Sequence, residues 1–306
     1  MLVEKKSLRL DNYMDTLNSL GEKSNIAEFA QQMIRLNLRN SLFVDCTANA
    51  EVAEVYNDVL TAYTSIVTAN KIACSSSYEH YKLLKSSASS KGVRFLFETN
   101  VGAGLPIINT INDLQLSGDK ILKIEAVLSG TLNFIFNEIS EEVSLSEAIR
   151  RAKEKGYSEP DPRIDLSGAD VVRKILILSR EAGYPLEKEE VQVNKFLPEE
   201  CFDGSLDDFW ERVKSQDAPF EEKRKKLAKE NKKWRFFATM DQGKAKVDLL
   251  VVESDHPAYN LAGSNNIILL TTERYKELPM VIKGYGAGAE VTAAGVFADI
   301  MRVANV

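Results

Sequence analysis

The chain has 306 residues, more than one hydrophobic core usually organises, so we expect two domains. Its composition, with 44% hydrophobic and 27% charged residues, is that of an ordinary folded protein and excludes a disordered or fibrous one. The net charge of -6 gives no general attraction to nucleic acid or anionic lipid, so neither is an expected partner.

Metal clusters, disulfides and membrane spans are not expected either. The 3 cysteines are far apart and form no C-x-x-C motif, and the chain has only 2 histidines. No apolar stretch approaches the roughly 20 residues that a membrane span needs. The N-terminal segment also lacks the apolar region of a signal peptide. We therefore expect a cytoplasmic protein.

The first third of the chain alternates short apolar runs with helical patterns. The predicted elements are strands at 41–45, 65–68 and 93–97 and helices at 52–62 and 78–90. Continuous apolar strands separated by helices are typical of a parallel sheet that is covered on both faces. Ligands of such sheets bind at the carboxyl ends of the strands, and the ligand is often a nucleotide.

Beyond residue 120 the pattern becomes mixed, with paired amphipathic strands near the end. The hairpin residues Asp241-Gln242-Gly243 separate two of these strands. The predicted elements are strands at 121–128, 232–240, 244–252, 266–271 and 279–283 and helices at 145–155, 169–182 and 291–303. The sequence therefore predicts an α/β protein whose second part is an α+β domain.

An acidic and stiff segment lies at 157–165, with the sequence Tyr-Ser-Glu-Pro-Asp-Pro-Arg-Ile-Asp. Its two prolines favour an extended, irregular backbone and space three carboxylates along it. The segment is either a solvated connection between helices or a rigid loop whose carboxylates bind an ammonium group.

Asp170 and Lys174 lie in the helix that follows. Ser167 and Asp170 match a capping box of the form S-x-x-D, and Asp170 and Lys174 form an i,i+4 pair, so both residues have a structural explanation. The apolar run at 175–178 indicates that the helix is buried, and a buried lysine is retained for a partner or a reaction. The pattern alone leaves both explanations open.

Two further candidate segments follow predicted strands. Lys71 comes just after the strand at 65–68, where ligands meet a doubly wound sheet, although surface lysines are also common at strand ends. The segment 98–106 runs from a strand end into a glycine-rich turn and Pro106. Free carbonyls and amides converge in such a turn, which is either a binding feature or a tight structural connection.

The glycines of Gly284–Gly288 satisfy G-x-G-x-x-A between a strand and a helix. A dinucleotide fingerprint also needs a second strand and an acidic ribose ligand, and neither follows here. The glycines permit the backbone to approach either a ligand or a neighbouring helix closely.

Together these segments resemble the homoserine dehydrogenase family, especially the form fused behind aspartate kinase. They occur in family order from about residue 40 onwards. The matching stretches are Val44–Thr47, Val67–Lys71, Glu98–Pro106, Leu128–Thr131, Gly156–Arg163, Asp165–Gly168, Asp170–Lys174, Gly284–Gly288 and Val291–Asp299.

The resemblance implies a homodimer that interconverts aspartate 4-semialdehyde and homoserine with NADP or NAD, in threonine and methionine biosynthesis. It implies that Lys174 delivers a proton to the reacting oxygen and that Lys71 lies beside the nicotinamide. Substrate contacts would come from Glu159, Asp165 and Asp170, and cofactor contacts from Thr47, Lys71, Gly156, Glu159 and Gly288. Backbone carbonyls of Glu98, Val101, Ala103 and Leu105 would form a sodium site.

The resemblance also implies the domain organisation. A Rossmann-like nucleotide-binding domain would cover 1–105, with 286–306 returning to it as a helix, and 106–285 would form the α+β domain for substrate binding, catalysis and dimerisation.

Family members begin their nucleotide domain with a strand and a G-x-G-x-x-G-type loop, which we do not find before Asn40. We therefore expect an incomplete, N-terminally truncated nucleotide domain. The alternative function is an impaired fragment that dimerises without a pyrophosphate loop. Ile164 also stands where relatives commonly have an acidic residue.

Overall fold

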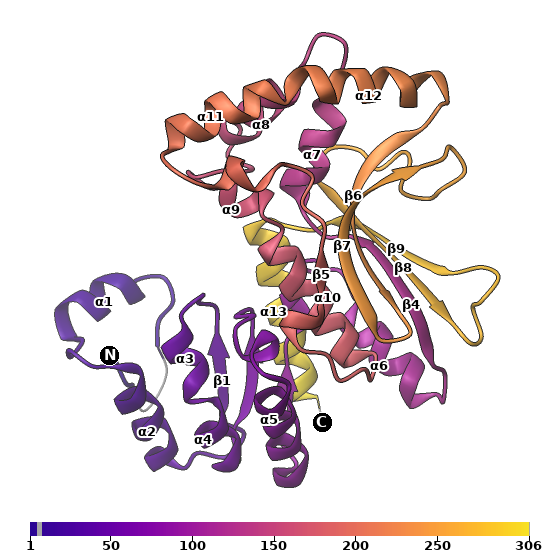
Figure 1. The fold of residues 1–306 in the computed structure, drawn as a ribbon. Coiled ribbons are helices and arrows are strands. Elements are labelled where there is room, and N and C mark those ends of the chain that lie inside the picture. Colours follow the sequence, from indigo (N-terminus) through magenta and orange to yellow (C-terminus); the bar gives the residue numbers. More distant parts are fainter. Residues whose placement is uncertain (5–7, 306) are drawn as a thin grey trace.

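Two β-sheets organise the computed structural model, which describes residues 1–4 and 8–305. The first sheet is parallel with strand order β1-β2-β3, formed by Leu42–Asp45, Ser65–Thr68 and Phe95–Leu96. All four residues of β2 are buried, as expected of a parallel strand that is covered on both faces. In Figure 1 this sheet lies in the lower, indigo to purple part of the molecule.

Helices from the first third of the chain and from its C-terminal part pack on this sheet. α4 (Tyr56–Thr61) and the C-terminal α13 (Ala289–Ala304) both contact β2, and α5 (Tyr78–Lys91) contacts α4 and β3. The prediction of a single helix at 52–62 is wrong, because α3 (Ala50–Glu54) ends before Val55 and α4 begins after it. Two helices that the sequence did not predict, α1 (Tyr13–Leu20) and α2 (Ile26–Leu36), precede β1.

The second sheet is mixed, with strand order β5-β7-β6-β4-β8-β9. The hairpin between β6 and β7 is confirmed: Gln242 and Gly243 both have positive φ, 45° and 86°, as a two-residue turn that matches the strand twist requires. The strands are β4 (Ile121–Val127), β5 (Gln192–Val193), β6 (Lys233–Asp241), β7 (Lys244–Val252), β8 (Asn265–Thr272) and β9 (Met280–Tyr285).

The two faces of the mixed sheet are covered differently. One face packs on α6 (Ile108–Leu116), α7 (Gly130–Glu138) and α10 (Ala169–Glu181), which form the main core with residues such as Ile124 and Ala126. The opposite face carries a smaller apolar cluster, over which the segment 253–264 folds. Arg235, only 1% exposed, holds that segment by donating to the carbonyls of Ala258, Tyr259 and Leu261.

The remaining helices form a separate layer, at the top of Figure 1. It contains α8 (Leu145–Glu154), α11 (Leu206–Ser215) and α12 (Asp217–Lys229), with the short α9 (Arg163–Leu166) below them. Short 3-10 turns occur at η1 (Ala73–Ser75), η2 (Glu98–Asn100), η3 (Lys188–Glu190) and η4 (Glu199–Phe202). Within the described ranges, every helix is too short or too polar to cross a membrane. These elements confirm the α/β class, with a nucleotide-binding type of sheet beside a second, mixed domain.

Candidate active site

Two lysines from distant parts of the chain share one carboxylate. Lys174 and Asp170 lie one turn apart on α10, and the Lys174 Nζ is 2.8 Å from Asp170 Oδ2. Lys71 follows β2, and its Nζ is 3.7 Å from Asp170 Oδ1. Lys174 Nζ also donates to the carbonyl oxygen of Leu128, just after β4, at 2.7 Å. The structure thus brings together Lys71, Asp170 and Lys174 where the carboxyl edge of the first sheet meets α10.

The charges of this group affect one another. Burial lowers the pKa of Lys71, Asp170 raises it in part, and the positive charge of Lys174 lowers it again, so that the net shift is downwards. Burial opposes ionisation of Asp170, but the two lysines outweigh that effect and hold its pKa below the usual value. The site therefore contains an ionised carboxylate between two amines, one of which loses its proton more readily than an ordinary lysine. Such a group is suited to proton transfer.

The capping box predicted for Ser167 and Asp170 is wrong. α10 begins after Gly168, whose φ of 73° is left-handed, and no side chain caps this end of the helix. Ser167 Oγ instead accepts the N–H of Ala169 and donates to the carbonyl of Ile164. The carboxylate of Asp170 is therefore used by the two lysines and not by the helix terminus.

The acidic segment is organised by one of its own carboxylates. Asp165 Oδ2 accepts the N–H of Glu159 at 2.8 Å and the hydroxyl of Ser158 at 3.1 Å. Thr131, at the start of α7, donates to the carbonyl of Tyr157. The segment is not extended throughout as predicted, because its last residues form α9. Glu159 itself is exposed.

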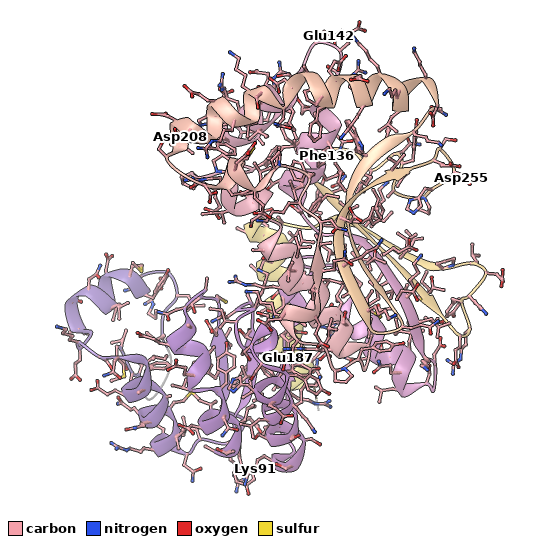
Figure 2. The ribbon with its side chains drawn as sticks, viewed as in Figure 1. Lys91, Phe136, Glu142, Glu187, Asp208 and Asp255 are labelled. Atoms are coloured by element: carbon pink, nitrogen blue, oxygen red, sulfur yellow. The ribbon has the colours of Figure 1, made fainter. Side chains whose placement is uncertain are left out.

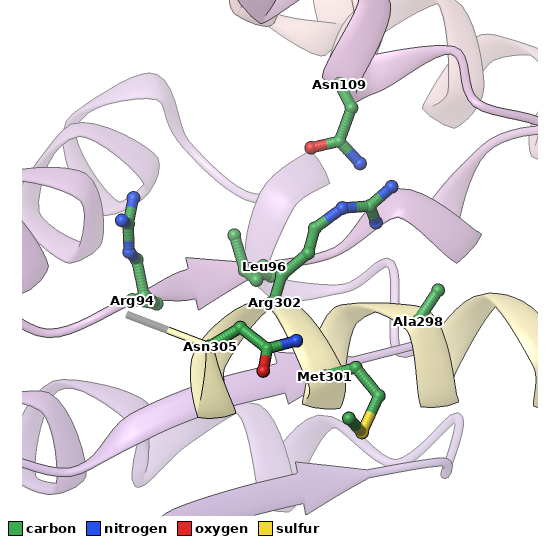
Figure 3. Close-up of a pocket in the computed structure, with 7 residues that line it drawn as sticks. All are labelled: Arg94, Leu96, Asn109, Ala298, Met301, Arg302 and Asn305. Atoms are coloured by element: carbon green, nitrogen blue, oxygen red, sulfur yellow. The ribbon is translucent and has the colours of Figure 1, made fainter.

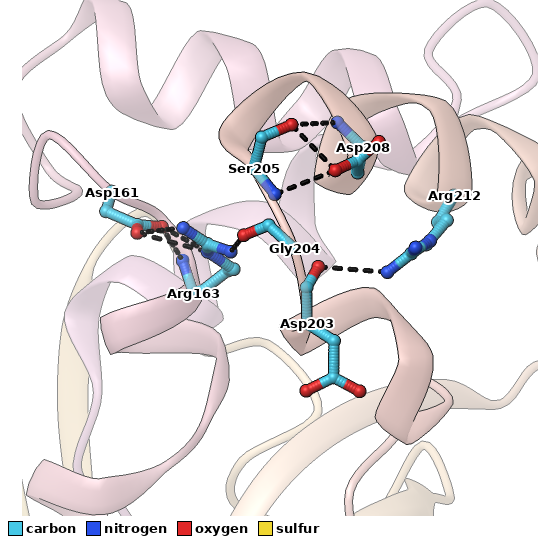
Figure 4. Close-up of polar contacts among 7 residues, drawn as sticks. All are labelled: Asp161, Arg163, Asp203, Gly204, Ser205, Asp208 and Arg212. Carbon is cyan, nitrogen blue, oxygen red and sulfur yellow. Dashed lines mark hydrogen bonds and ion pairs between the residues drawn. The ribbon is translucent and has the colours of Figure 1, made fainter.

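Arg163 ties the acidic segment to the helical layer, as Figure 4 shows. Its guanidinium binds both oxygens of Asp161, with distances of 2.7–3.0 Å, and Nη1 donates to the carbonyl of Gly204 at 2.8 Å. The next residue, Ser205, begins α11 with a capping box to Asp208. Sequence reasoning did not single out Arg163. The close Asp161-x-Arg163 spacing suggests the ion pair, but nothing in the sequence indicates the contact with Gly204.

Three of the predicted cofactor residues lie at or near the carboxyl edge of the first sheet. Thr47 follows β1 and Lys71 follows β2, and Asn70 links the two strand ends by donating to Asp45 Oδ2 at 3.0 Å and to the carbonyl of Asn49 at 2.8 Å. Gly288, with φ 131°, starts α13, which contacts both β2 and η2. The fourth and fifth, Gly156 and Glu159, lie in the second domain, Gly156 just before the acidic segment and Glu159 within it.

These residues fit the nicotinamide end of a dinucleotide. Thr47, Lys71 and Gly288 lie at or near strand ends at which ligands of parallel sheets bind, and the buried hydroxyl of Thr99 in η2 has no hydrogen-bond partner within the described residues. Gly156, with φ 71°, has open space where a side chain would start. None of the loops that follow β1, β2 and β3 has the G-x-G-x-x-G pattern, so these loops do not provide a pyrophosphate site of that kind.

The predicted sodium site fits in part. The carboxylate of Glu98 accepts the N–H groups of Ile107, Ile108 and Asn109, so it caps the start of α6 and is not free to bind a metal. Ala103, with φ 53°, is one of the few non-glycine residues in the left-handed region. The buried carbonyls of Val101 and Ala103 accept no hydrogen bond in the part of the chain described, as expected of oxygen ligands for a hard cation. The other two carbonyls, of Glu98 and Leu105, already accept backbone N–H groups.

The glycines at 284–288 mainly allow close packing within the protein. A Cβ on Gly284 would lie 2.9 Å from the side chain of Leu105, and one on Gly286 would lie 1.9 Å from the amide carbon of Asn266. The close approach is therefore to a loop and a strand, and not to the neighbouring helix that the sequence suggested as the alternative to a ligand. Only Gly288 remains as a candidate for ligand contact.

A cavity of about 570 Å³ lies elsewhere, beside β3 and the end of α13. Figure 3 shows its lining: Arg94, Leu96, Asn109, Ala298, Met301, Arg302 and Asn305. It includes none of the predicted site residues. The arrangement of charged groups, and not the volume of a cavity, therefore identifies the candidate site.

Comparisons with known proteins identify the family of the chain. The family model described as homoserine dehydrogenase matches residues 106–301, and the model of the homoserine dehydrogenase NAD-binding domain matches residues 2–98. The likeness thus extends further towards the N-terminus than the motifs from residue 40 onwards indicated. Nothing in these matches favours the alternative of an impaired fragment.

Among curated relatives, a bifunctional aspartokinase/homoserine dehydrogenase from Haemophilus influenzae is 39% identical over 303 residues, which are 99% of this chain and 37% of the relative. A chloroplastic bifunctional enzyme from Arabidopsis thaliana is 38% identical over 99% of this chain and 34% of its own length. The chain therefore spans little more than a third of the curated relatives it matches.

Two solved structures are also similar. A protein of unknown function from Candida auris has a TM-score of 0.92 and 34% identity, and the match covers 99% of this chain and 87% of that protein. A hyperthermophilic archaeal homoserine dehydrogenase in complex with NADPH has a TM-score of 0.73 and 26% identity, with coverage of 98% and 84%. Fold and site together define the class of nicotinamide-dependent oxidoreductases. The chain belongs to the homoserine dehydrogenase family.

Proposed function

We propose that this protein interconverts aspartate 4-semialdehyde and homoserine with NADP or NAD. The observation that carries the proposal is the group of Lys71, Asp170 and Lys174 at the carboxyl edge of a parallel sheet. When bound, the reduced nicotinamide supplies a hydride to the aldehyde carbon. Lys174 donates a proton to the carbonyl oxygen as negative charge develops there, and Lys71 lies beside the same oxygen.

The acidic residues bind the amino end of the substrate in this proposal. Asp170 is close to both lysines, and Glu159 is exposed on a loop whose shape Asp165 fixes through two hydrogen bonds. A carboxylate on an ordered loop attracts an ammonium group at little entropic cost. Asp165 thus contributes mainly by holding Glu159 in place.

The remaining site residues complete the proposal. Thr47, Lys71, Gly156, Glu159 and Gly288 contact the cofactor, and the carbonyls of Glu98, Val101, Ala103 and Leu105 bind sodium. The nucleotide-binding domain comprises residues 1–105 with the returning helix of 286–306, and residues 106–285 form the catalytic domain. The separate parallel and mixed sheets support this division.

We further propose that two copies associate through the mixed sheet. The segment 253–264 already covers the apolar cluster of the open face. On the edge strand β9, however, Val281 and Tyr285 lie on this face with 48% and 70% of their surface exposed. Exposed apolar residues on an edge strand favour association with another sheet.

Oxidation of homoserine tests the reaction directly. Purified protein is incubated with homoserine and NADP, and separately with NAD, at alkaline pH, and the absorbance of the reduced nicotinamide is followed. We expect reduced cofactor to form with the parent protein and not with Lys174→Met, which removes the proton-transferring amine. Threonine and serine in place of homoserine separate this activity from that of another hydroxy-acid dehydrogenase. A parent protein that is inactive with both cofactors would contradict the proposal.

A further inference from the structure

Helix α10 lies along the contact between the two domains and carries residues of the candidate site. Asp170 and Lys174 lie near its start, and Arg180 and Glu181 lie in its last turn. With 3.6 residues per turn, Asp170, Lys174 and Glu181 lie on nearly the same side of the helix. Asp170 and Glu181 both bind lysines of the nucleotide-binding domain, Lys71 and Lys85. This side of α10 therefore faces the other domain.

Arg180 makes three hydrogen bonds in this contact. Its side chain is fully buried and donates through Nη1 to the carbonyl of Cys74 at 3.0 Å and through Nε to the carbonyl of Leu186 at 3.0 Å. Its Nη2 donates to Glu187 Oε2 at 3.1 Å. Glu187 in turn accepts the N–H of Tyr78, the first residue of α5. Figure 2 places Glu187 where the lower domain meets the rest of the molecule.

The carbonyl that Arg180 binds belongs to the turn that begins at Lys71. Ser75 closes this turn, because both its N–H and its hydroxyl donate to the carbonyl of Lys71, at 3.0 and 2.8 Å. Cys74, one residue earlier, is 0% exposed. Arg180 therefore binds the backbone three residues after Lys71. Asp170, which lies ten residues before Arg180 on the same helix, binds the amine of Lys71. One rigid helix thus fixes both ends of the Lys71 turn.

We propose that Arg180 is a positioning residue that holds the Lys71 turn against α10, so that Lys71 and Lys174 share the carboxylate of Asp170 across the domain boundary. This role rests on the proposed function, in which both lysines meet the reacting oxygen. Asp170 is 3.7 Å from Lys71, so a small displacement of the turn breaks that ion pair. A shift of about 1 Å in a catalytic group can cost about 10²-fold in rate.

The surroundings of Lys71 determine how a displacement of its turn changes the pKa of its amine. The charged groups that act on it come from α10, namely Asp170, Arg173 and Lys174. At the end of the adjacent strand, Asp45 is already bound by Asn70 and Tyr56. Burial is the largest cause of the lowered pKa of Lys71. A turn released from α10 exposes the amine to water, so the pKa of Lys71 rises towards that of an ordinary lysine.

Arg180→Lys tests the proposal because a lysine keeps the positive charge but cannot bind Cys74, Leu186 and Glu187 at once. The matched control is Arg235→Lys, since Arg235 is also buried and donates to backbone carbonyls, those of Trp234, Ala258, Tyr259 and Leu261, but lies in β6 away from this contact. Amine labelling with acetic anhydride is measured against pH by peptide mass spectrometry, with the exposed Lys214 as internal reference. This readout does not require turnover.

We expect the labelling midpoint of Lys71 to move to higher pH in Arg180→Lys and to stay at the parental value in Arg235→Lys. We also expect kcat/KM for homoserine to fall by about 10- to 100-fold in Arg180→Lys only. A parental midpoint in Arg180→Lys, or an equal shift in both variants, would overturn the proposal. If the parent is inactive but the midpoint shifts as expected, the positioning role stands and the proposed reaction fails.

A second variant guards against poor folding of Arg180→Lys. Glu187→Gln neutralises a side chain that is 41% exposed and keeps one oxygen for the N–H of Tyr78, but weakens the hold on Arg180 Nη2. We expect the labelling midpoint of Lys71 to shift in the same direction and by a smaller amount. An unchanged midpoint in a folded Glu187→Gln protein together with an unfolded Arg180→Lys protein would count against a positioning role and for a purely structural one.

Discussion

Lys174 donates a hydrogen bond to the carbonyl oxygen of Leu128 at 2.7 Å, which fixes a lysine of α10 to the end of β4. An ammonium group has three donors, and Asp170 accepts a second one at 2.8 Å. One N–H is therefore left for a substrate oxygen. This arrangement orients the remaining proton without a flexible lysine side chain having to be ordered during the reaction.

Replacement of Lys174 separates catalysis from stability. We expect Lys174→Ala to lower kcat by about 10² to 10⁴, the usual contribution of a positioned acid. The free energy of unfolding should fall by only about 1–3 kcal/mol, because the carbonyl of Leu128 loses its buried donor. Steady-state kinetics and denaturant unfolding measure the two effects. In Lys174→Arg the charge remains but the proton is hardly released near neutral pH, so kcat should stay low. A parental kcat in this variant would mean that Lys174 acts through its charge alone.

Asp170→Asn should change how stability depends on pH. The pKa of Asp170 is lowered in the folded protein, so its carboxylate stabilises the fold above its ordinary value of 3.8. That contribution is lost as the pH falls through the lower, folded value. Because the side chain is 52% exposed, we expect less than about 1 kcal/mol at neutral pH. Denaturant unfolding at several pH values checks the sign: the difference between parent and variant should shrink below about pH 4. A difference that is the same at all pH values would show that the ion pairs are not its source.

Gly286 and Asn266 should show strong coupling in a double-mutant cycle. A Cβ at position 286 would lie 1.9–2.4 Å from the amide atoms of Asn266, so Gly286→Ala should destabilise the fold by about 1–3 kcal/mol. Asn266→Ala removes all the atoms in that clash. The double variant should therefore be more stable than the sum of the single effects predicts, as measured by thermal unfolding. Additive effects would mean that there is no steric clash between the side chains at positions 286 and 266.

Local patterns predicted the elements whose signal is local. β2 and the β6–β7 hairpin match the prediction because a run of β-branched residues and a two-residue turn that contains glycine leave little choice. The capping box failed because Gly168 adopts a left-handed φ, which a serine three residues before an aspartate does not reveal. The contact between Arg180 and Cys74 spans 106 residues, so no pattern in either segment indicates it.

The candidate site could likewise be predicted only in part from the sequence. The residues themselves left Lys71 and Lys174 undecided between structural and functional roles, and the resemblance to a family favoured functional ones. The structure adds that both lysines meet Asp170, which follows from the packing of α10 on the first sheet. Tertiary packing of this kind depends on the whole chain and is not encoded in the spacing of the residues concerned.

A charge on the open face of the mixed sheet should weaken the proposed dimer. Val281 lies in the edge strand β9 opposite Leu269, which belongs to the apolar cluster of the open face. We expect Val281→Lys to place an ammonium group in the interface and to raise the dimer dissociation constant by at least about 10-fold, since about 1.4 kcal/mol suffices for that change.

Val251→Lys is the matched control. Val251 is 47% exposed against 48% for Val281, but it pairs with Trp234, which packs into the main core on the other face. Light scattering over a dilution series should show dissociation of the Val281 variant at concentrations where the parent and the Val251 variant remain dimeric. A monomeric parent at micromolar concentration would contradict the dimer itself, whereas equal weakening by both substitutions would place the interface elsewhere.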